Sequence, residues 1–349
     1  MADTQRGKST ITLQDVARQA GVSPMTVSNV INAKTGVRPV TRQRVLDAVA
    51  STGYRVNPMA RALAGGRSRL ISVFAPQLNK LYAAEVVHGA AQAAEVLNYD
   101  LVVMMLGEST ASDLSVMTRM SVGALLIQPS QQRLWWRTDL PTHVVSVDGP
   151  GERPFTVDNF GGACLATRHL IELGHTHIGF ISGLLDEDRV SGGNKPGPVQ
   201  YDRDDADERF RGYQTSMAQA GLDIPRGYVQ HGDYTKASGE AAARKLLDLK
   251  TPPTAVFVSG DAMALGAMHV AQDRGLEVPG DLSVVGFDDL PIAAASRPGL
   301  STVRQPLRLM GEAAVKMLVA LADGHNPPLP PPFLTELIRR ESAAPPKDH

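Results

Sequence analysis

Apolar and polar residues alternate with two different spacings along this chain, and the change falls near residue 70. Before it, apolar residues recur at intervals of three and four, which lines one face of a helix. Two such stripes are present, Val16, Ala17 and Ala20, then Val27, Val30 and Ile31. After it, short continuous apolar runs alternate with helical stretches, as in buried parallel strands joined by helices. The pattern predicts a small helical unit followed by a larger α/β unit.

The first unit is predicted to begin with two short helices. Thr12 with Asp15 three residues later resembles a capping box, and Gly21 suits the end of that helix. Ser23 can cap a second helix, and Pro24 suits its first position because no amide hydrogen is missed there. Two helices joined by a tight turn form the helix-turn-helix arrangement, in which the second helix enters the DNA major groove. A helical hairpin without DNA contact would show the same pattern.

Charge is distributed unevenly between the two units. Residues 1–69 hold eleven Lys or Arg against three Asp, a net charge of +8, whereas residues 70–349 carry a net charge of −9. A basic module on an acidic body favours phosphate binding at one end, and the alternative is a solvated basic face without a partner. Together with the helix pattern, the charge favours nucleic acid.

Two sets of strands are predicted after residue 69. They are LISVFAP (70–76), DLVVMML (100–106), GALLIQP (123–129) and THVVSVD (142–148), then HIGFISG (177–183), YVQHGD (228–233), TAVFVSG (254–260) and LSVVGFD (282–288). Intervening helices such as 83–97 and 239–249 imply two doubly wound parallel α/β units, which bind ligands beyond the carboxyl ends of their strands. Residues just after those ends are therefore candidates, although each could simply cap a helix: Gln128, Asp148, Tyr234, Gly260, Asp261, Asp288 and Asp289.

Several classes of protein are disfavoured. No apolar run reaches membrane-spanning length and the basic N-terminus lacks the apolar stretch of a secretory signal, so we expect a cytoplasmic protein without membrane contact. Cys164 is the single cysteine and is expected to be a buried free thiol. GxSxG, HExxH and GxxxxGK[ST] are all absent, so we expect no enzyme, no catalytic residues and no cofactor. His175 and His177 fit a helix-to-strand corner better than a metal site.

Four stretches resemble one known family. They are TLQDVARQAGVSPMTVSNVIN, GYRVNPMARALAGGRS, HLIELGHTHIGFISG, and DAMALGAM with VPGDLSVVGFDDLP and RPGLSTVRQP. In their order, over roughly 10–340, they resemble the lactose-repressor/galactose-repressor family of bacterial transcription regulators. The resemblance implies a helix-turn-helix headpiece, a hinge helix and a core like periplasmic sugar-binding proteins. It also implies a homodimer whose affinity for operator DNA is changed by a small effector.

The resemblance assigns domains along the chain. The headpiece is expected at 10–56, the hinge helix and linker at 57–69, and the effector-binding core at 70–345. Within the core, the first subdomain is expected at about 70–157 and 305–325, and the second at about 158–304 and 326–341.

The resemblance also implies which residues meet DNA. Base edges are expected to face Pro24, Met25 and Asn29, whereas phosphates or the groove edge are expected near Thr12, Leu13, Ser23, Thr26, Ser28, Asn32 and Thr41. Asn29 replaces the arginine common in the family, and asparagine pairs with adenine where arginine pairs with guanine. Arg38 replaces a usual serine, which removes a helix cap and adds a possible phosphate contact.

The stretch 57–68 is too short to be a stable helix alone, so DNA is expected to order it. The resemblance implies that Asn57 begins a hinge helix, and that two such helices pair and insert Leu63 into the minor groove with Ala60 packed close by. A flexible linker is the alternative.

For the effector, the resemblance points to residues in both predicted subdomains. Arg209 matches an arginine that holds ring hydroxyls or a carboxylate, and Asp288 matches an acceptor that binds hydroxyls. Asp148 matches an acidic contact, and Tyr234 an aromatic plate on which a sugar can stack. Asp261 is a further candidate and Tyr82 a weaker one, while Gly260 stands where relatives often have asparagine. A sugar or sugar derivative is expected.

Two further stretches complete the prediction. Residues 184–208 carry eight acidic and three basic side chains and are expected to lack regular structure, either as a lid or as a disordered insertion. The tail after the predicted last strand, 333–341, has no heptads, so a dimer rather than a tetramer is expected. We therefore expect an operator-binding repressor; the alternative is a free sugar-binding protein or a sugar-processing enzyme.

Overall fold

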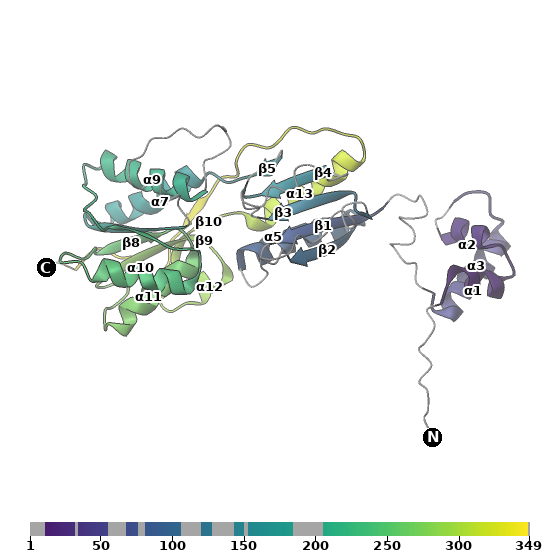
Figure 1. The fold of residues 1–349 in the computed structure, drawn as a ribbon, viewed down its shortest axis with the longest axis horizontal. Helices are drawn as coiled ribbons and strands as arrows, with labels where there is room; N and C mark the ends of the chain where they lie inside the picture. The colour runs from purple at the N-terminus through teal and green to yellow at the C-terminus, as the bar shows by residue number, and fades with distance from the viewer. Residues whose placement is uncertain are drawn as a thin grey trace, which may run out of the picture. The chain divides into compact units, whose positions relative to one another are not determined.

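The computed structural model describes residues 11–31, 34–54, 68–75, 81–105, 120–127, 143–149, 153–183 and 205–347. The chain divides into two compact units, Met1–Ser68 and Arg69–His349, whose helices and strands are labelled in Figure 1. Several predicted site residues lie outside the described ranges, namely Asn32, Asn57, Ala60, Leu63 and Gln128.

The described part of the first unit holds three helices, α1 (Leu13–Ala20), α2 (Pro24–Ile31) and α3 (Pro39–Thr52). The predicted caps are confirmed: Thr12 and Asp15 form a capping box, and Gly21 ends α1 with φ of 61°. The Ser23 hydroxyl accepts a hydrogen bond from the Thr26 amide at 3.2 Å. The sequence thus sets both ends of the helix-turn-helix locally.

A small apolar core joins the three helices. Its buried side chains are Val16, Ala17, Ala20, Val27, Val30, Val45 and Ala48. Two polar links support it: Gln19 donates to the Ser51 hydroxyl at 2.7 Å, and Arg42 donates to the carbonyl of Lys34 at 2.7 Å. Because α1 and α3 cover only one side of α2, Met25 on that helix remains 74% exposed.

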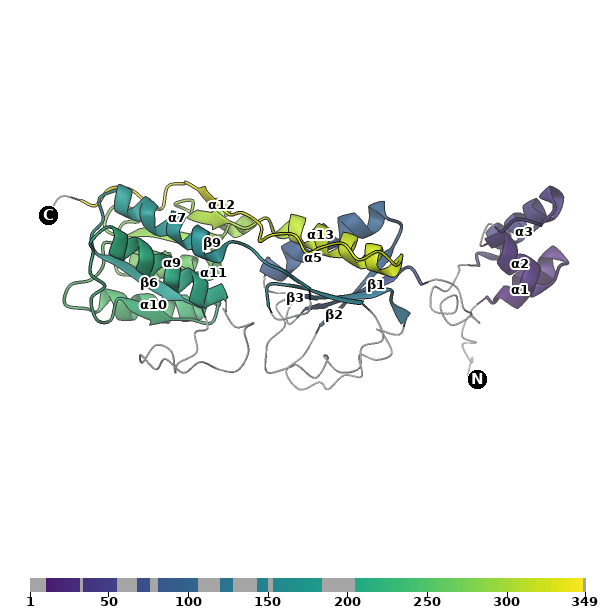
Figure 2. The ribbon, with the colours of Figure 1, turned by 90° about the horizontal axis from the view of Figure 1, so that it is seen from above.

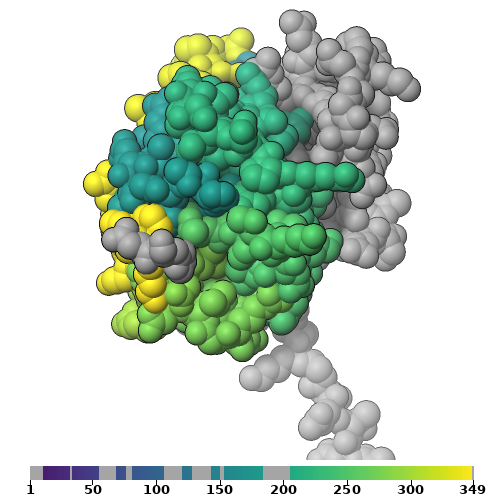
Figure 3. Space-filling model, turned by 90° about the vertical axis from the view of Figure 1, so that its left-hand side faces the viewer, coloured from purple at the N-terminus to yellow at the C-terminus, as the bar shows by residue number. Residues whose placement is uncertain are grey.

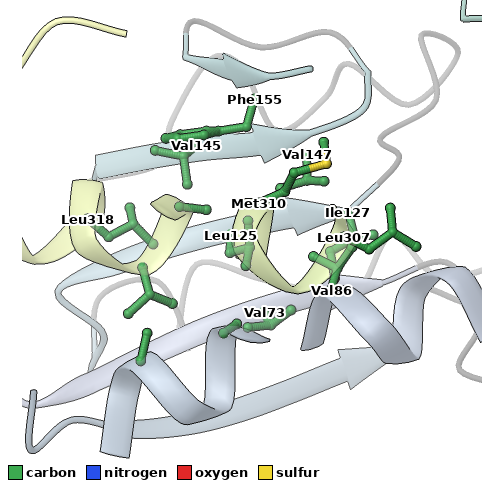
Figure 4. Close-up of a cluster of buried hydrophobic side chains, with 14 of the residues drawn as sticks. Val73, Val86, Leu125, Ile127, Val145, Val147, Phe155, Leu307, Met310 and Leu318 are labelled. Carbon is green, nitrogen blue, oxygen red and sulfur yellow. The ribbon is translucent and has the colours of Figure 1, made fainter. Parts of the chain in front are cut away.

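In the second unit, one described sheet has five parallel strands in the order β2-β1-β3-β4-β5. They are β1 (Leu70–Ala75), β2 (Asp100–Met105), β3 (Gly123–Ile127), β4 (His143–Val147) and β5 (Pro154–Phe155). Helices α5 (Leu81–Val96) and α13 (Leu307–Ala322) lie side by side on one face (Figure 2). Figure 4 shows their side chains packed on this face, Val86 from α5 and Leu307, Met310 and Leu318 from α13 meeting Val73, Leu125 and Val145. A Cβ at Gly89 would overlap the Arg308 carbonyl, so glycine permits this close helix contact.

The other described sheet has six strands in the order β11-β10-β9-β8-β6-β7, all parallel except β11. They are β6 (Ile178–Ser182), β7 (Val229–His231), β8 (Ala255–Val258), β9 (Ser283–Asp288), β10 (Ser301–Arg304) and β11 (Glu336–Ile338). One face packs on α7 (Asn159–Glu172) and α9 (Asp205–Gln219), the other on α10 (Lys236–Leu247) and α11 (Asp261–Asp273). A short α12 (Pro291–Ala295) follows β9. The predicted fold, a helix-turn-helix unit and two parallel α/β layers, is confirmed.

Some sequence predictions need correction. All eight predicted strands occur within their predicted ranges, but β5 and β10, of two and four residues, were missed. The predicted last strand shrinks to β11, an antiparallel edge strand. The prediction that 184–208 lacks regular structure is wrong for 205–208, which begin α9. Asp205, Asp207 and Glu208 fit its first turn because acidic side chains are favourable at the positive end of a helix.

The chain passes repeatedly between the two sheets, and its C-terminal end is attached to the second. Val157 pairs in parallel with Phe333, so two of the crossing segments lie side by side. The Ser342 hydroxyl donates to the Val284 carbonyl at 2.6 Å and accepts from the Ser301 amide at 2.8 Å. In Figure 3 the yellow C-terminal residues accordingly lie against the teal residues of the α7 region.

Candidate functional site

The first candidate surface is the side of α2 that faces away from the apolar core. Pro24 and Met25 are exposed, and Ser28 and Asn29 are half-buried. Thr26 is also half-buried, and its hydroxyl lies 2.9 Å from that of Ser23. Small polar side chains with one flexible apolar residue therefore line this face, a composition that suits contact with base edges and phosphates.

The neighbouring helices add to this surface unequally. Thr12 is exposed, but its hydroxyl donates to Asp15 at 2.7 Å. Leu13 packs partly against the apolar core. Arg38 precedes α3, is exposed and makes no side-chain cap bond, as its replacement of a capping residue predicts, while Thr41 is half-buried in α3.

The second candidate site, which we call the Arg209 site, lies at the carboxyl ends of the strands of the second unit. Arg209 extends from α9 and is only 3% exposed. Its Nε donates to Asn159 Oδ1 at 2.8 Å, and its Nη1 donates to the Ser259 carbonyl at 2.6 Å. The guanidinium lies 3.9 Å from the ring centre of Phe287, and Nη1 lies 3.9 Å from Asp288 Oδ1. Arg209 is therefore a fixed, buried cation.

Asp288 ends β9 in a left-handed conformation, with φ of 118°. Gln305 Nε2 donates to its Oδ1 at 2.6 Å. Burial raises the pKa of Asp288 to about 6, while Arg209 and the Gln305 hydrogen bond act against this rise. The carboxylate thus lies in a site that disfavours its charge unless a donor is added.

Asp148 supplies a carboxylate from the first sheet, directly after β4, and is 2% exposed. The Tyr82 hydroxyl on α5 donates to its Oδ2. Burial raises the pKa of Asp148 well above its usual range, and Asp205 adds to the rise, whereas Tyr82 and Arg209 oppose it. Asp205, Arg209 and Asp288 of the second sheet therefore act electrostatically on Asp148 of the first.

Tyr234 lies beside the same carboxyl ends, half-buried and with φ of 65°. A Cβ at Gly183 would overlap the Tyr234 ring, so the ring lies against the bare backbone after β6. A Cβ at Gly260 would lie 3.2 Å from Tyr234 Cδ1 and 3.6 Å from Asp288 Oδ2. Glycine at 260 therefore leaves open the space that a larger side chain would occupy beside both residues.

Two of the predicted candidates have other partners. Asp261 is fully buried, and its carboxylate accepts hydrogen bonds from the Thr302 hydroxyl at 2.6 Å and the Leu290 amide at 2.7 Å. Asp289 pairs with Arg304 at 2.7 Å and with Arg340 at 2.6 Å. Both carboxylates hold the loop after β9.

Backbone strain is concentrated near this site. Among the described residues, five residues other than glycine have positive φ, and four of these lie at or shortly after strand ends: Asp148, Tyr234, Asp288 and Asp289. Such conformations cost about 1–3 kcal/mol each and persist where the surroundings fix them, often at ligand sites.

The sequence analysis did not predict four residues of the Arg209 site: Asn159, Asp205, Phe287 and Gln305. Asn159 joins two of the charges, because its Oδ1 accepts from Arg209 and its Nδ2 donates to Asp205 at 2.9 Å. Gln305 stood within the motif RPGLSTVRQP, and Phe287 within the predicted strand 282–288, but neither had a local sign of its role.

Metal and membrane functions gain no support from the described ranges. No group of three or more metal-ligating side chains occurs within them, and none of their helices is long and apolar enough to cross a membrane. His175 is a corner residue as predicted, since its ring nitrogens bond to Thr254 Oγ1 and the Ala344 carbonyl, both at 2.9 Å. Cys164 is a buried free thiol, also as predicted.

Comparison with known proteins gives the same division of the chain. Residues 12–57 match the bacterial regulatory proteins of the lacI family, and residues 167–343 match a periplasmic binding protein-like domain. Catabolite control protein A of Priestia megaterium is 33% identical over 318 residues, spanning 88% of this chain and 91% of that protein. The HTH-type transcriptional repressor PurR of Aliivibrio salmonicida is 32% identical over 333 residues, spanning 90% and 93%.

Solved structures are similar over almost the full length. The lac repressor dimer bound to operator and the anti-inducer ONPF has 27% identity and a TM-score of 0.80, covering 96% of this chain and all of that one. The complex of the transcriptional regulator CelR with cellobiose has 29% identity and a TM-score of 0.67, covering 95% and 99%. The resemblance seen in the sequence motifs is therefore confirmed. This chain belongs to the lacI family of bacterial transcription regulators, and it joins a helix-turn-helix headpiece to a periplasmic-binding-protein-like effector domain.

Proposed function

We propose that this protein is a homodimeric, cytoplasmic repressor without enzymatic activity, whose affinity for operator DNA is changed by a carbohydrate-like effector at the Arg209 site. The buried cluster of Arg209, Asp148 and Asp288 carries the proposal, because it joins the carboxyl ends of both core sheets. Relatives described as an operator-bound dimer and as a cellobiose complex support both parts.

On the DNA side, the face of α2 enters the major groove. Asn29 donates to and accepts from an adenine edge, and Met25 contacts a thymine methyl group. Thr12, Ser23, Thr26, Ser28, Arg38 and Thr41 position the helix along the phosphates. Outside the described residues, the hinge stretch with Asn57, Ala60 and Leu63 orders on DNA and inserts Leu63 into the minor groove.

On the effector side, Arg209 and Asp288 bind hydroxyls from the second sheet and Asp148 binds one from the first. Tyr234 provides a ring for stacking. Tyr82 and Asp261 act as positioning residues, because each is bonded to the protein, Tyr82 to Asp148 and Asp261 to Thr302.

An effector held from both sheets restricts the angle between them. A change in that angle alters how the two protomers present their hinge stretches to DNA, which couples the sites energetically. Such coupling is reciprocal and typically amounts to about 1–3 kcal/mol.

Binding of the full-length protein to the DNA upstream of its own gene tests the proposal. We expect a saturable, sequence-preferring complex at moderate salt, and weaker specific binding by Leu63→Ala. Binding no stronger than to unrelated DNA would favour the alternative, a free sugar-binding protein or a sugar-processing enzyme.

A further inference from the structure

The carboxyl end of α2 lacks the local features that end its two neighbouring helices. Helix α1 ends at Gly21 and α3 at Gly53, and both glycines have positive φ. After α2 no glycine occurs before Gly36, and the last turn of α2 contains no basic side chain. The last carbonyls of a helix have no partner within the helix, and a nearby cation stabilises them. The end of α2 therefore depends on partners from outside the helix.

Arg42 on α3 supplies such partners. Its side chain is half-buried, and its Nη2 donates to the Lys34 carbonyl at 2.7 Å. Its Nη1 donates to the carbonyl of Val30, the next-to-last residue of α2, at 3.4 Å. A planar guanidinium holds two acceptors in fixed directions, whereas the ammonium group of a lysine acts as a single point. One side chain thus joins α3 both to the last turn of α2 and to the turn that follows it.

The same contacts reach Asn29, the residue proposed to read an adenine edge. The Asn29 carbonyl accepts a hydrogen bond from the Lys34 amide at 2.9 Å. The backbone of Lys34 is therefore held on two sides, by Asn29 at its amide and by Arg42 at its carbonyl. A bidentate contact with a base requires an accurately placed amide group, so the residues that fix this backbone affect base discrimination.

We propose that Arg42 is a positioning residue for DNA recognition. By holding the Val30 and Lys34 carbonyls, it fixes the carboxyl end of α2 and the turn after it. The Asn29 side chain is thereby directed at its base. Arg42 acts through these two backbone carbonyls rather than through a DNA phosphate, although it belongs to the basic headpiece. The inference rests on the proposed function, because it concerns the base contact of Asn29.

Selection of binding sites from a randomised duplex library by the full-length protein tests the inference. The native protein defines the preferred half-site, and Asn29→Ala shows which position of it Asn29 reads. Arg42→Lys keeps the positive charge but cannot hold two carbonyls as a fork, so the preference at that position should fall about tenfold. Arg44→Lys is the matched control, because Arg44 is an exposed arginine two positions further along α3. It should leave the preference unchanged.

Two further measurements separate positioning from a purely structural role and from phosphate contact. In a double-mutant cycle on the selected site, Arg42→Lys should weaken binding about tenfold in the native protein but less than about twofold in Asn29→Ala, because the two residues act together. Arg42→Met removes the charge, and the salt dependence of its binding to unrelated DNA should stay close to that of the native protein. A lost phosphate contact would lower that slope by about 0.9.

Three results would overturn the inference. One is an equal effect of Arg42→Lys with and without Asn29, and another is a uniform loss of preference at every position, as general destabilisation of the headpiece would cause. The third is a fall of about 0.9 in the salt slope of Arg42→Met. Failure of the native protein to enrich any sequence would overturn the proposed function as well, which distinguishes the two failures.

Discussion

The side of α2 that we propose to face DNA and the Arg209 site are built in opposite ways. Met25 on α2 is 74% exposed, and the helix is held by a small apolar core on its other side. Arg209 is 3% exposed and is held by Asn159 and Ser259 at the site itself. In the headpiece, the side chains proposed to recognise DNA are therefore not the ones that stabilise the fold. In the core, the side chains proposed to bind the effector also stabilise the fold.

Replacing Arg209 should have the largest effect. Arg209→Ala leaves buried carboxylates without their cation, which typically destabilises a protein by about 3–5 kcal/mol. Urea unfolding of the core, followed by tryptophan fluorescence or circular dichroism, measures this loss. Arg211→Ala is the matched control, since Arg211 is an exposed neighbour paired with Glu208 at 2.7 Å, and it should change stability by less than about 0.5 kcal/mol. Equal effects of the two substitutions would contradict the contrast.

The pH dependence of core stability should come next. Burial raises the pKa of Asp288 from 3.8 to about 6, so the folded state keeps a proton that the unfolded state has already lost. The resulting stabilisation is present at low pH and is lost as pH rises through about 6. One pKa unit corresponds to about 1.4 kcal/mol, which gives a fall on the order of 2–3 kcal/mol.

Other buried acids titrate as well, so the informative quantity is the difference between the native protein and Asp288→Asn. Unfolding curves between pH 4 and pH 7 should show a smaller fall in the variant. Identical pH profiles would show that Asp288 does not have a raised pKa.

In the headpiece, Asn29 should affect DNA binding without affecting stability. Asn29→Ala removes the bidentate base contact proposed for this residue and should weaken specific binding by about 1–3 kcal/mol. Asn29→Arg should shift the preferred base at one half-site position from adenine to guanine. Selection from a randomised half-site library measures the shift. An unchanged sequence preference would rule out base contact by Asn29.

Arg38 gives the smallest and most specific effect, because stability and DNA binding should change in opposite directions. Arg38 precedes α3 without a side-chain cap bond, so Arg38→Ser should stabilise the headpiece by about 1 kcal/mol. It should also remove a phosphate contact and reduce the salt dependence of DNA binding by about one charge. Thermal unfolding and salt titrations test the two parts, and a loss of stability would contradict the first.

The sequence predicted what local patterns determine. Thr12, Ser23 and Gly21 act on their own helix ends, Asp148 directly follows an apolar strand and Asp288 ends one, so these residues could be found without tertiary information. The sequence could not reveal that Asn159 bridges Arg209 and Asp205, which lie about fifty positions further along the chain.

Other differences have the same origin. Asp261 has the sequence position of a ligand contact, but folding supplies Thr302 as its partner from 41 residues away. Strand β10 is only four residues long and becomes a strand through pairing with β9 and β11 on either side. Contacts between segments that are distant in the sequence determine these features, so the spacing of residues along the chain does not predict them.

The central claim is that the Arg209 site and the DNA-facing side of α2 are energetically coupled although they are built separately. Fluorescence anisotropy of labelled upstream DNA, titrated with native protein and with Asp288→Ala at zero and saturating effector, tests it most directly. The effector should change the DNA affinity of the native protein by about 5- to 150-fold. It should leave that of Asp288→Ala unchanged, and the two proteins should bind DNA equally without effector. A normal effector response in Asp288→Ala would contradict the account.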